Sequence, residues 1–235
     1  MTAYLSEFFG MFLLILMGNG VVANISLNKS GMKGAGAIMI NISWGLAVMI
    51  PAFIFGTTSG AHFNPAVTIA LAVDKTISWS IVPGYIIAQF LGAFCGQLFV
   101  YIMYKDHFDA TENPATVFGC FATRPTIHNL PRNFFCEIVT TFVLMFAIKG
   151  ISQVTNIAQG ISYIYVFGII AGIGMSFGGL TGFAINPARD LSPRLLHTIL
   201  PIKNKSSSNW DYAIVPAIAP IIGAVIAVTL YNWIF

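Results

Sequence analysis

Six long apolar stretches follow one another along the chain. They cover residues 3–25, 37–56, 79–103, 132–151, 160–179 and 211–234. A helix that crosses the hydrocarbon core of a bilayer needs about 20 predominantly apolar residues. The pattern therefore predicts an all-α integral membrane protein with six transmembrane helices.

Two shorter and more polar segments, residues 60–73 and 181–196, follow the second and the fifth stretch. Each holds about ten helical residues, or about 15 Å, which is half the thickness of the hydrocarbon core. Neither can cross alone, but two half-membrane re-entrant helices placed end to end would complete one span. Non-helical backbone at this depth is tolerated where it lines a wet cavity, so these segments indicate a pore.

The two halves of the chain repeat each other. Residues 59–68 read Ser-Gly-Ala-His-Phe-Asn-Pro-Ala-Val-Thr, and residues 181–190 read Thr-Gly-Phe-Ala-Ile-Asn-Pro-Ala-Arg-Asp. Glu7 in the first stretch is matched by Glu137 in the fourth. Three spans in each half, approximately residues 1–115 and 116–235, force the second half to enter the membrane upside down. We therefore expect a single transmembrane channel domain, residues 1–235, built as an inverted repeat.

Composition agrees with this class of protein. Hydrophobic residues make up 57% of the chain and charged residues 8%, whereas soluble domains carry roughly 25% charged residues. The net charge of +3 comes with no basic run that would indicate nucleic acid. The sequence contains no nucleotide motif and no metal-ligand spacing, and its four histidines are scattered. We therefore expect no cofactor, no metal and no enzymatic activity.

The three cysteines form no paired motif. Cys95 and Cys136 lie in or beside apolar stretches, where a cysteine is usually a small buried hydrophobe. Cys120 lies in a polar loop, a place where its side chain could be exposed to solvent.

Two triplets have the sequence of helix starts: Asn64, Pro65 and Ala66, and Asn186, Pro187 and Ala188. Asn is a favoured N-cap and Pro is favoured at the first helical position. An N-cap Asn accepts a backbone N–H through its side-chain oxygen, which leaves its NH₂ group as a free double donor. The positive ends of both helix dipoles would also point at the membrane midplane. Such a site suits a neutral hydroxylated solute and repels cations.

These triplets, together with Ser6-Glu7-Phe8 and residues 181–194, resemble the major intrinsic protein (aquaporin) family, and within it the bacterial glycerol facilitators. The resemblance covers nearly the whole chain. It implies the aquaporin fold and a passive channel for glycerol and similar small neutral solutes, with some water. It also implies a homotetramer surrounded by membrane lipid, with both termini cytoplasmic. The distribution of Lys and Arg runs against the usual positive-inside bias, so this orientation rests on the resemblance alone.

The resemblance assigns a selectivity filter to Trp44, Gly174, Phe183 and Arg189. Water-selective members are expected to carry His at the position of Gly174, and Gly leaves the passage wider. Trp44 and Phe183 would form an apolar corner for carbon-bound hydrogens, and Arg189 would donate to hydroxyls. Asp190, directly after Arg189, also resembles the glycerol branch, although its main role could be to pair with a nearby basic group.

The same resemblance places backbone carbonyls along the pore. Their residues are Gly60, Ala61, His62 and Phe63 on one side, with Phe183, Ala184 and Ile185 opposite. Glu7 and Glu137 would hold these loops by accepting backbone N–H groups, although carboxylates inside a membrane are also suspects for proton coupling. The His62 side chain fits either a scaffold role or a place in the lumen.

Two other functions stay open. A strictly water-selective aquaporin is disfavoured by Gly174 and Asp190. A secondary transporter also uses inverted repeats and broken helices, and it would show saturation and a coupling ion. The sequence does not rank glycerol against water, dihydroxyacetone, urea or lactic acid.

Overall fold

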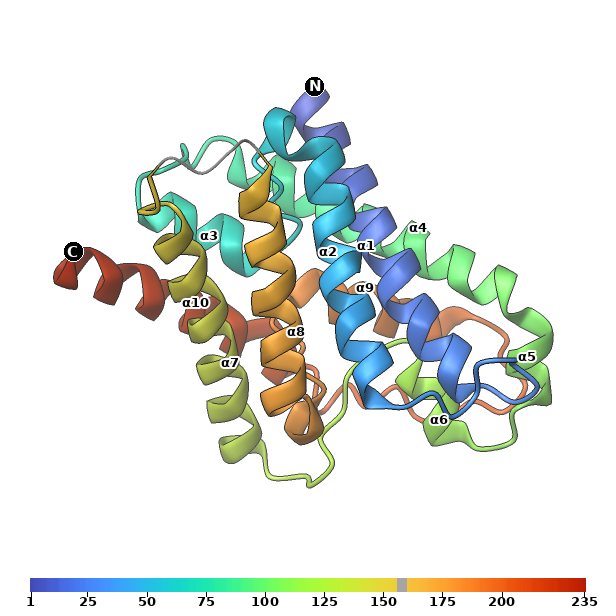
Figure 1. Cartoon of the computed structure of the whole chain (residues 1–235). Coiled ribbons are helices and arrows are strands. Elements are labelled where there is room, and N and C mark those ends of the chain that lie inside the picture. The colour runs from blue at the N-terminus through green and yellow to red at the C-terminus, as the bar shows by residue number, and fades with distance from the viewer. Residues whose placement is uncertain (156–159) are drawn as a thin grey trace.

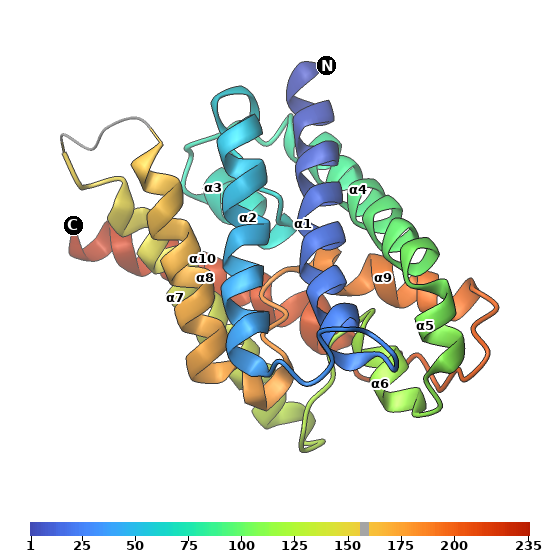
Figure 2. The ribbon, with the colours of Figure 1, turned by 45° about the vertical axis from the view of Figure 1, so that its right-hand side comes forward.

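A computed structural model describes residues 1–155 and 160–235. Within these residues every regular element is a helix (Figures 1 and 2). Six of them are long and apolar enough to cross a membrane, and their bounds are α1 (Thr2–Ser26), α2 (Ala37–Ser59), α4 (Val82–Met103), α7 (Leu130–Ile151), α8 (Ile161–Thr181) and α10 (Ile214–Ile234). The predicted all-α membrane fold with six spans is confirmed.

Four shorter helices complete the described part of the chain. Two of them follow the Asn-Pro-Ala triplets, namely α3 (Pro65–Val73) and α9 (Pro187–Ile199). The other two, α5 (Lys105–Ala110) and α6 (Pro114–Gly119), lie in the connection between α4 and α7. Sequence analysis predicted the first pair but not the second.

Two of the predicted spans begin too early. The third was placed from residue 79, but α4 begins at Val82 because a turn through Ile81 precedes it. The sixth was placed from residue 211, but α10 begins at Ile214, after Asn209 has taken a left-handed conformation with φ of 47°. Apolar side chains also occur in both turns, namely Trp79 and Ile81 in the first and Trp210 and Tyr212 in the second, so hydropathy alone does not mark these starts.

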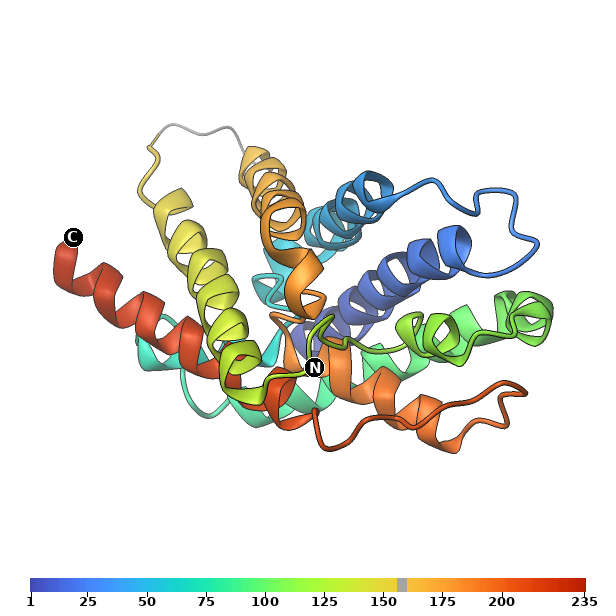
Figure 3. The same cartoon turned by 90° about the horizontal axis from the view of Figure 1, so that it is seen from below.

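The six long helices pack side by side in the order α4, α1, α2, α8, α7, α10 (Figure 3). The half-membrane helices α3 and α9 lie between the two ends of this series and contact both α4 and α10. Each packs mainly on a long helix of the opposite half of the chain, α3 on α10 and α9 on α4. The two repeats are therefore interlocked.

Two glycines permit close approach at equivalent places in the two repeats. A Cβ atom added to Gly92 on α4 would lie 2.2 Å from the carbonyl oxygen of Phe8 on α1. A Cβ atom added to Gly223 on α10 would lie 2.2 Å from the carbonyl oxygen of Ile138 on α7. Phe8 and Ile138 directly follow the paired glutamates, so these contacts fix the helices that carry Glu7 and Glu137.

We predict that Gly223→Ala lowers the melting temperature in detergent micelles. The new methyl group meets backbone, which cannot rotate away, and overpacking of this kind costs about 1–3 kcal/mol. Gly172→Ala on α8 is the matched control, because apart from the adjoining backbone of α8 a Cβ atom there has no atom within 4 Å. Replacing glycine inside a helix otherwise stabilises it by about 0.5–1 kcal/mol, so the control should melt at the wild-type temperature or above. Equal melting temperatures for the two variants would contradict the close contact.

Asp74 fastens the C-terminal end of α3 to two long helices of the second repeat. Its carboxylate accepts hydrogen bonds from Lys149 Nζ at 2.9 and 3.1 Å and from Asn232 Nδ2 at 2.6 Å. Burial by itself would raise the pKa of this carboxyl. Hydrogen bonds from Thr76, Lys149 and Asn232, together with the positive charge of Lys149, lower the pKa by more than burial raises it. The pKa of Asp74 therefore lies below its usual value.

This shift predicts a pH-dependent contribution to stability. A carboxyl with a lowered pKa stabilises the fold fully above its ordinary pKa, and the contribution is lost as the pH falls through the lowered value. Asp74→Asn should therefore lower the melting temperature near pH 7 and reduce the further loss between pH 5 and pH 3. The exposed Asp106→Asn variant is the control and should follow the wild-type curve. Parallel curves for wild type and Asp74→Asn would overturn the assignment.

Candidate functional site

The two loops that precede α3 and α9 share an unusual backbone conformation. Left-handed φ values recur at matching positions, and the residues are Gly60 (84°), Ala61 (51°) and Phe63 (45°), and Gly182 (83°), Phe183 (38°) and Ile185 (46°). Non-glycine residues rarely adopt such values, and each costs about 1–3 kcal/mol unless the surroundings hold it. A backbone of this shape forms no helix or strand ladder, so its buried N–H groups need other partners.

Glu7 supplies those partners in the first repeat. Its Oε1 atom accepts hydrogen bonds from Ser59 Oγ at 2.7 Å and from the His62 backbone N–H at 3.0 Å. Its Oε2 atom accepts from the Phe63 backbone N–H at 2.8 Å and from Gln89 Nε2 at 2.7 Å. The side chain is fully buried between α1, α4 and the loop.

Glu137 makes the equivalent contacts in the second repeat. Its Oε1 atom accepts from Thr181 Oγ1 at 2.6 Å and from the Ala184 N–H at 2.9 Å, and its Oε2 atom accepts from the Ile185 N–H at 3.0 Å. The two carboxylates accept hydrogen bonds from the N–H groups on one side of each loop. The loop carbonyls on the opposite side do not contact the carboxylates and can accept hydrogen bonds from other groups. Within the two loops, residues 60–63 and 182–185, the carbonyls that accept no hydrogen bond are those of Gly60, Ala61, His62, Gly182, Phe183 and Ala184.

Asn64 and Asn186 cap the two half-membrane helices. Asn64 Oδ1 accepts from the Ala66 N–H at 2.9 Å, and Asn186 Oδ1 accepts from the N–H groups of Ala188 at 3.1 Å and Arg189 at 3.2 Å. Each is followed by proline at the start of its helix. The sequence predicted this capping geometry.

The predicted free double donor at each asparagine is wrong. Asn64 Nδ2 donates to the Ile185 carbonyl at 2.8 Å, and Asn186 Nδ2 donates to the Phe63 carbonyl at 2.7 Å. Each amide NH₂ group therefore donates one hydrogen bond to the loop of the opposite repeat, and its second N–H can donate to a solute. The carbonyls of Phe63 and Ile185 each retain one lone pair.

Two cavities meet at Trp44, Phe183 and Arg189, which line both of them. One has a volume of about 160 Å³, and its walls include the two loops, the capping asparagines and side chains of α1, α2, α3, α7 and α8. The other has a volume of about 470 Å³, and its walls include Gly174 and Asn41. Residues common to two adjoining cavities form the boundary between them, so these three side chains mark a constriction.

The constriction combines two aromatic rings with one guanidinium group. The Arg189 guanidinium carbon lies 4.4 Å from the centre of the Trp44 ring, and Phe183 stands edge-on to Trp44 at 6.4 Å between ring centres. A Cβ atom added to Gly174 would lie 2.9 Å from the Phe183 ring. The structure thus brings together the four residues that sequence analysis assigned to a filter.

His62 lines the smaller cavity and is also held in place. Its Nδ1 atom lies 3.1 Å from Thr68 Oγ1, and its ring packs against Tyr85 at 5.0 Å between centres. The sequence left open whether His62 is a scaffold residue or lies in the lumen, and in this position its side chain does both.

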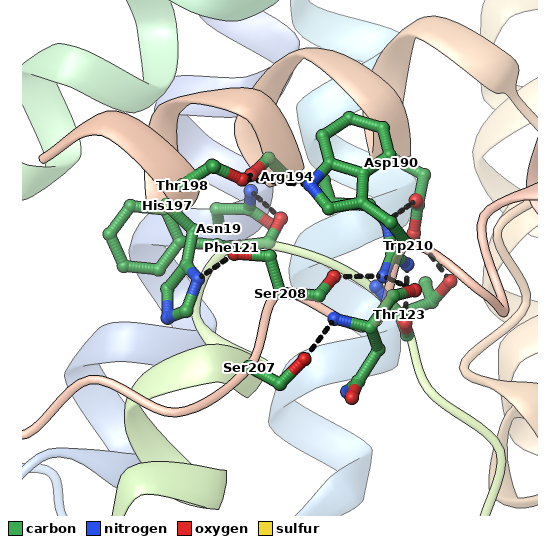
Figure 4. Close-up of polar contacts among 11 residues, drawn as sticks. Asn19, Phe121, Thr123, Asp190, Arg194, His197, Thr198, Ser207, Ser208 and Trp210 are labelled. Atoms are coloured by element: carbon green, nitrogen blue, oxygen red, sulfur yellow. Dashed lines mark hydrogen bonds and ion pairs between the residues drawn. The ribbon is translucent and has the colours of Figure 1, made fainter.

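Asp190 and Arg194 form a fully buried ion pair beside the constriction (Figure 4). Arg194 Nε donates to Asp190 Oδ1 at 2.8 Å, and Asp190 Oδ2 accepts from both the N–H and the hydroxyl of Thr123, at 2.7 and 2.6 Å. Arg194 also donates to the carbonyls of Thr123, Ser208 and Asn209 at 2.7 to 2.9 Å. The pair therefore fastens two loops to α9, the helix that carries Arg189, and Asp190 has the basic partner that its sequence position suggested.

Cys120 is fully buried, so the expectation that it could be exposed is wrong. It follows α6, which folds the connection between α4 and α7 into a cluster containing Phe108, Phe118 and Phe121. Its thiol donates to the Thr116 carbonyl at 3.4 Å, and burial raises its pKa. Cys95 and Cys136 are half-buried and free. Among the described residues no group of three His, Cys, Asp or Glu side chains could hold a metal ion.

Comparisons with known proteins agree with this geometry. The sequence profile of the family described as "Major intrinsic protein" matches residues 1–231. A probable glycerol uptake facilitator protein of Thermotoga maritima is 47% identical over 235 residues and covers all of both chains. A glycerol uptake facilitator protein of Streptococcus pneumoniae is 44% identical over 99% of each chain. The X-ray structure of the aquaglyceroporin from Plasmodium falciparum superposes with a TM-score of 0.86, at 31% identity, over 98% of this chain and 95% of that one.

Proposed function

The chain belongs to the major intrinsic protein family, and from this premise we propose that it is a passive channel for glycerol and similar small neutral solutes, with some water. It is a multi-pass membrane protein and not an enzyme. The observation that carries the proposal is the constriction between the two cavities, where aromatic rings face a single guanidinium group.

The walls of this constriction match the two edges of a polyol. Trp44 and Phe183 present apolar ring surface to carbon-bound hydrogens, and Arg189 donates hydrogen bonds to hydroxyl oxygens. Gly174 contributes no side chain and keeps the passage wide enough for a carbon skeleton. In this proposal the four residues are the selectivity filter, and the glycerol branch is favoured over a water-selective pore.

Beyond the filter, the solute moves along the free carbonyls of the two loops and past the capping asparagines. The carbonyls accept from its hydroxyls, and the remaining N–H of Asn64 and of Asn186 donates to them. Arg189 repels cations at the filter, and the positive ends of α3 and α9 repel them at the capping asparagines. Glu7 and Glu137 act through the loops as scaffold residues, not as proton carriers.

We extend the proposal to domain organisation, orientation and assembly. Residues 1–235 form one channel domain with repeat halves of approximately 1–115 and 116–235, and both termini lie in the cytoplasm. The protein assembles as a homotetramer in the cell membrane with one pore in each subunit. Large apolar side chains exposed on the outside of the helices, such as Ile87, Phe99 and Ile164, suit contacts with lipid and neighbouring subunits.

Stopped-flow light scattering on proteoliposomes tests the function. Compared with protein-free vesicles, we expect fast downhill glycerol entry that does not saturate, together with measurable water flux. Water flux without glycerol flux would indicate a water-selective pore. Saturating uptake that depends on an ion gradient would indicate a secondary transporter.

A further inference from the structure

Asn41 is a buried amide that sequence analysis did not single out. It lies on α2 one helical turn before Trp44, and only 7% of the residue is exposed. Among residues 1–155 and 160–235, no side-chain hydrogen bond involves Asn41, and its amide atoms are not among the buried polar atoms that are closed off from solvent. An amide that has no partner in the protein and borders a cavity is available to whatever passes through that cavity, so Asn41 is a candidate for contact with a solute.

The amide points into the larger cavity at the edge of the constriction. Asn41 lines that cavity together with Trp44, Gly174 and Arg189. Its Oδ1 atom lies 2.5 Å from the position that a Cβ atom on Gly174 would take, and its Cγ atom lies 3.0 Å from the same point. The absence of a side chain at Gly174 therefore leaves space in the passage, and a polar group, the Asn41 amide, borders that space.

This amide supplies chemistry that Arg189 lacks. A guanidinium group has only donors, whereas an asparagine side chain has an acceptor and two donors. A hydroxyl group both donates and accepts, so full pairing of a solute hydroxyl needs an acceptor as well as a donor. The aromatic rings of Trp44 and Phe183 provide no comparable acceptor, so the Asn41 oxygen adds a side-chain acceptor to the free backbone carbonyls of the neighbouring loop.

We propose that Asn41 is a specificity-determining residue that binds a hydroxyl of an incoming short polyol at the cavity side of the filter. The inference rests on the proposed glycerol function and deepens it. Asn41 favours solutes with several hydroxyls, because the amide and the guanidinium can then pair with different hydroxyls of one molecule.

The experiment compares glycerol and water permeability in the same proteoliposomes for wild type, Asn41→Ala and Asn41→Ser. The ratio of the two permeabilities corrects for the amount of folded channel, because loss of folding lowers both. Removing one net hydrogen bond changes an equilibrium by about fivefold, so we expect Asn41→Ala to lower the ratio by about fivefold. Alanine also widens the cavity, so a purely steric role for Asn41 would raise the ratio instead.

Asn41→Ser keeps a donor and an acceptor and is expected to retain a ratio within about twofold of wild type, since a hydroxyl supplies both functions. Ser43→Ala is the matched control, because Ser43 lies on the same helix but lines a separate cavity between α1, α2 and α4. It should leave the ratio unchanged.

The outcomes separate this inference from the proposed function. Absence of glycerol flux through the wild-type protein would overturn the proposed function itself. Wild-type glycerol flux with an unchanged or raised ratio in Asn41→Ala would overturn only the role of Asn41. An equal fall in Asn41→Ala and Asn41→Ser would also overturn it, because hydrogen-bonding capacity would not be the property that matters.

Discussion

Gly174→His is expected to lower glycerol permeability by about a hundredfold. A Cβ atom at this position would already lie 2.5 Å from Asn41 Oδ1 and 2.9 Å from the Phe183 ring. The imidazole must therefore project into the constriction or displace those side chains. Overpacking costs about 1–3 kcal/mol, and about 2.7 kcal/mol added to the barrier for passage corresponds to a hundredfold in rate.

Stopped-flow permeability to glycerol and to water measures this effect. Water is narrower than glycerol, so we expect its flux to persist and the ratio of glycerol to water flux to collapse. Gly172→His on the same helix is the control, because apart from the adjoining backbone of α8 no atom lies within 4 Å of a Cβ atom there. Glycerol permeability close to the wild-type value in Gly174→His would place the narrow part of the pore elsewhere.

Glu137→Ala is expected to prevent accumulation of folded protein. The change removes the acceptor for the Thr181 hydroxyl and for the N–H groups of Ala184 and Ile185. Each buried donor without a partner costs about 1–3 kcal/mol, so the three together cost about 3–9 kcal/mol, which is comparable to the stability of a typical domain, about 5–15 kcal/mol. The left-handed conformations of Phe183 and Ile185 lose their support at the same time.

Size-exclusion chromatography and thermal unfolding in detergent test this expectation. The exposed Glu112→Ala variant is the control and should purify and melt as the wild type does. Glu137→Gln keeps one oxygen acceptor and should yield a less stable but folded protein. That protein should still conduct glycerol downhill, with a permeability independent of an imposed proton gradient. A folded Glu137→Ala protein of wild-type stability would refute the scaffold role, and loss of conduction in folded Glu137→Gln would favour proton coupling.

The outline of the fold could be predicted because it depends on local properties of the chain. Length and hydropathy identify a membrane-crossing helix one segment at a time, since each helix satisfies its own backbone hydrogen bonds. The caps of α3 and α9 are equally local, because Asn64 and Asn186 bond to the N–H groups of residues two or three positions on. An odd number of spans in each repeat then determines that the halves are inverted.

Family resemblance added the residues of the proposed filter, which no local pattern identifies. Trp44, Gly174 and Arg189 come from different helices, and only the fold brings them to one constriction. The resemblance therefore named the positions, and the geometry supplied the distances between them.

What the sequence by itself determined is the set of six spans, the two half-membrane helices, their capping residues and the inverted repeat. Only the tertiary structure decided that each capping amide bonds to the opposite loop, that Cys120 is buried and that Asn41 borders the space beside Gly174. The same holds for the contact between Asp74 and Lys149. The physical reason is that these interactions join residues far apart in the chain, whose side chains meet only after the two repeats have interlocked.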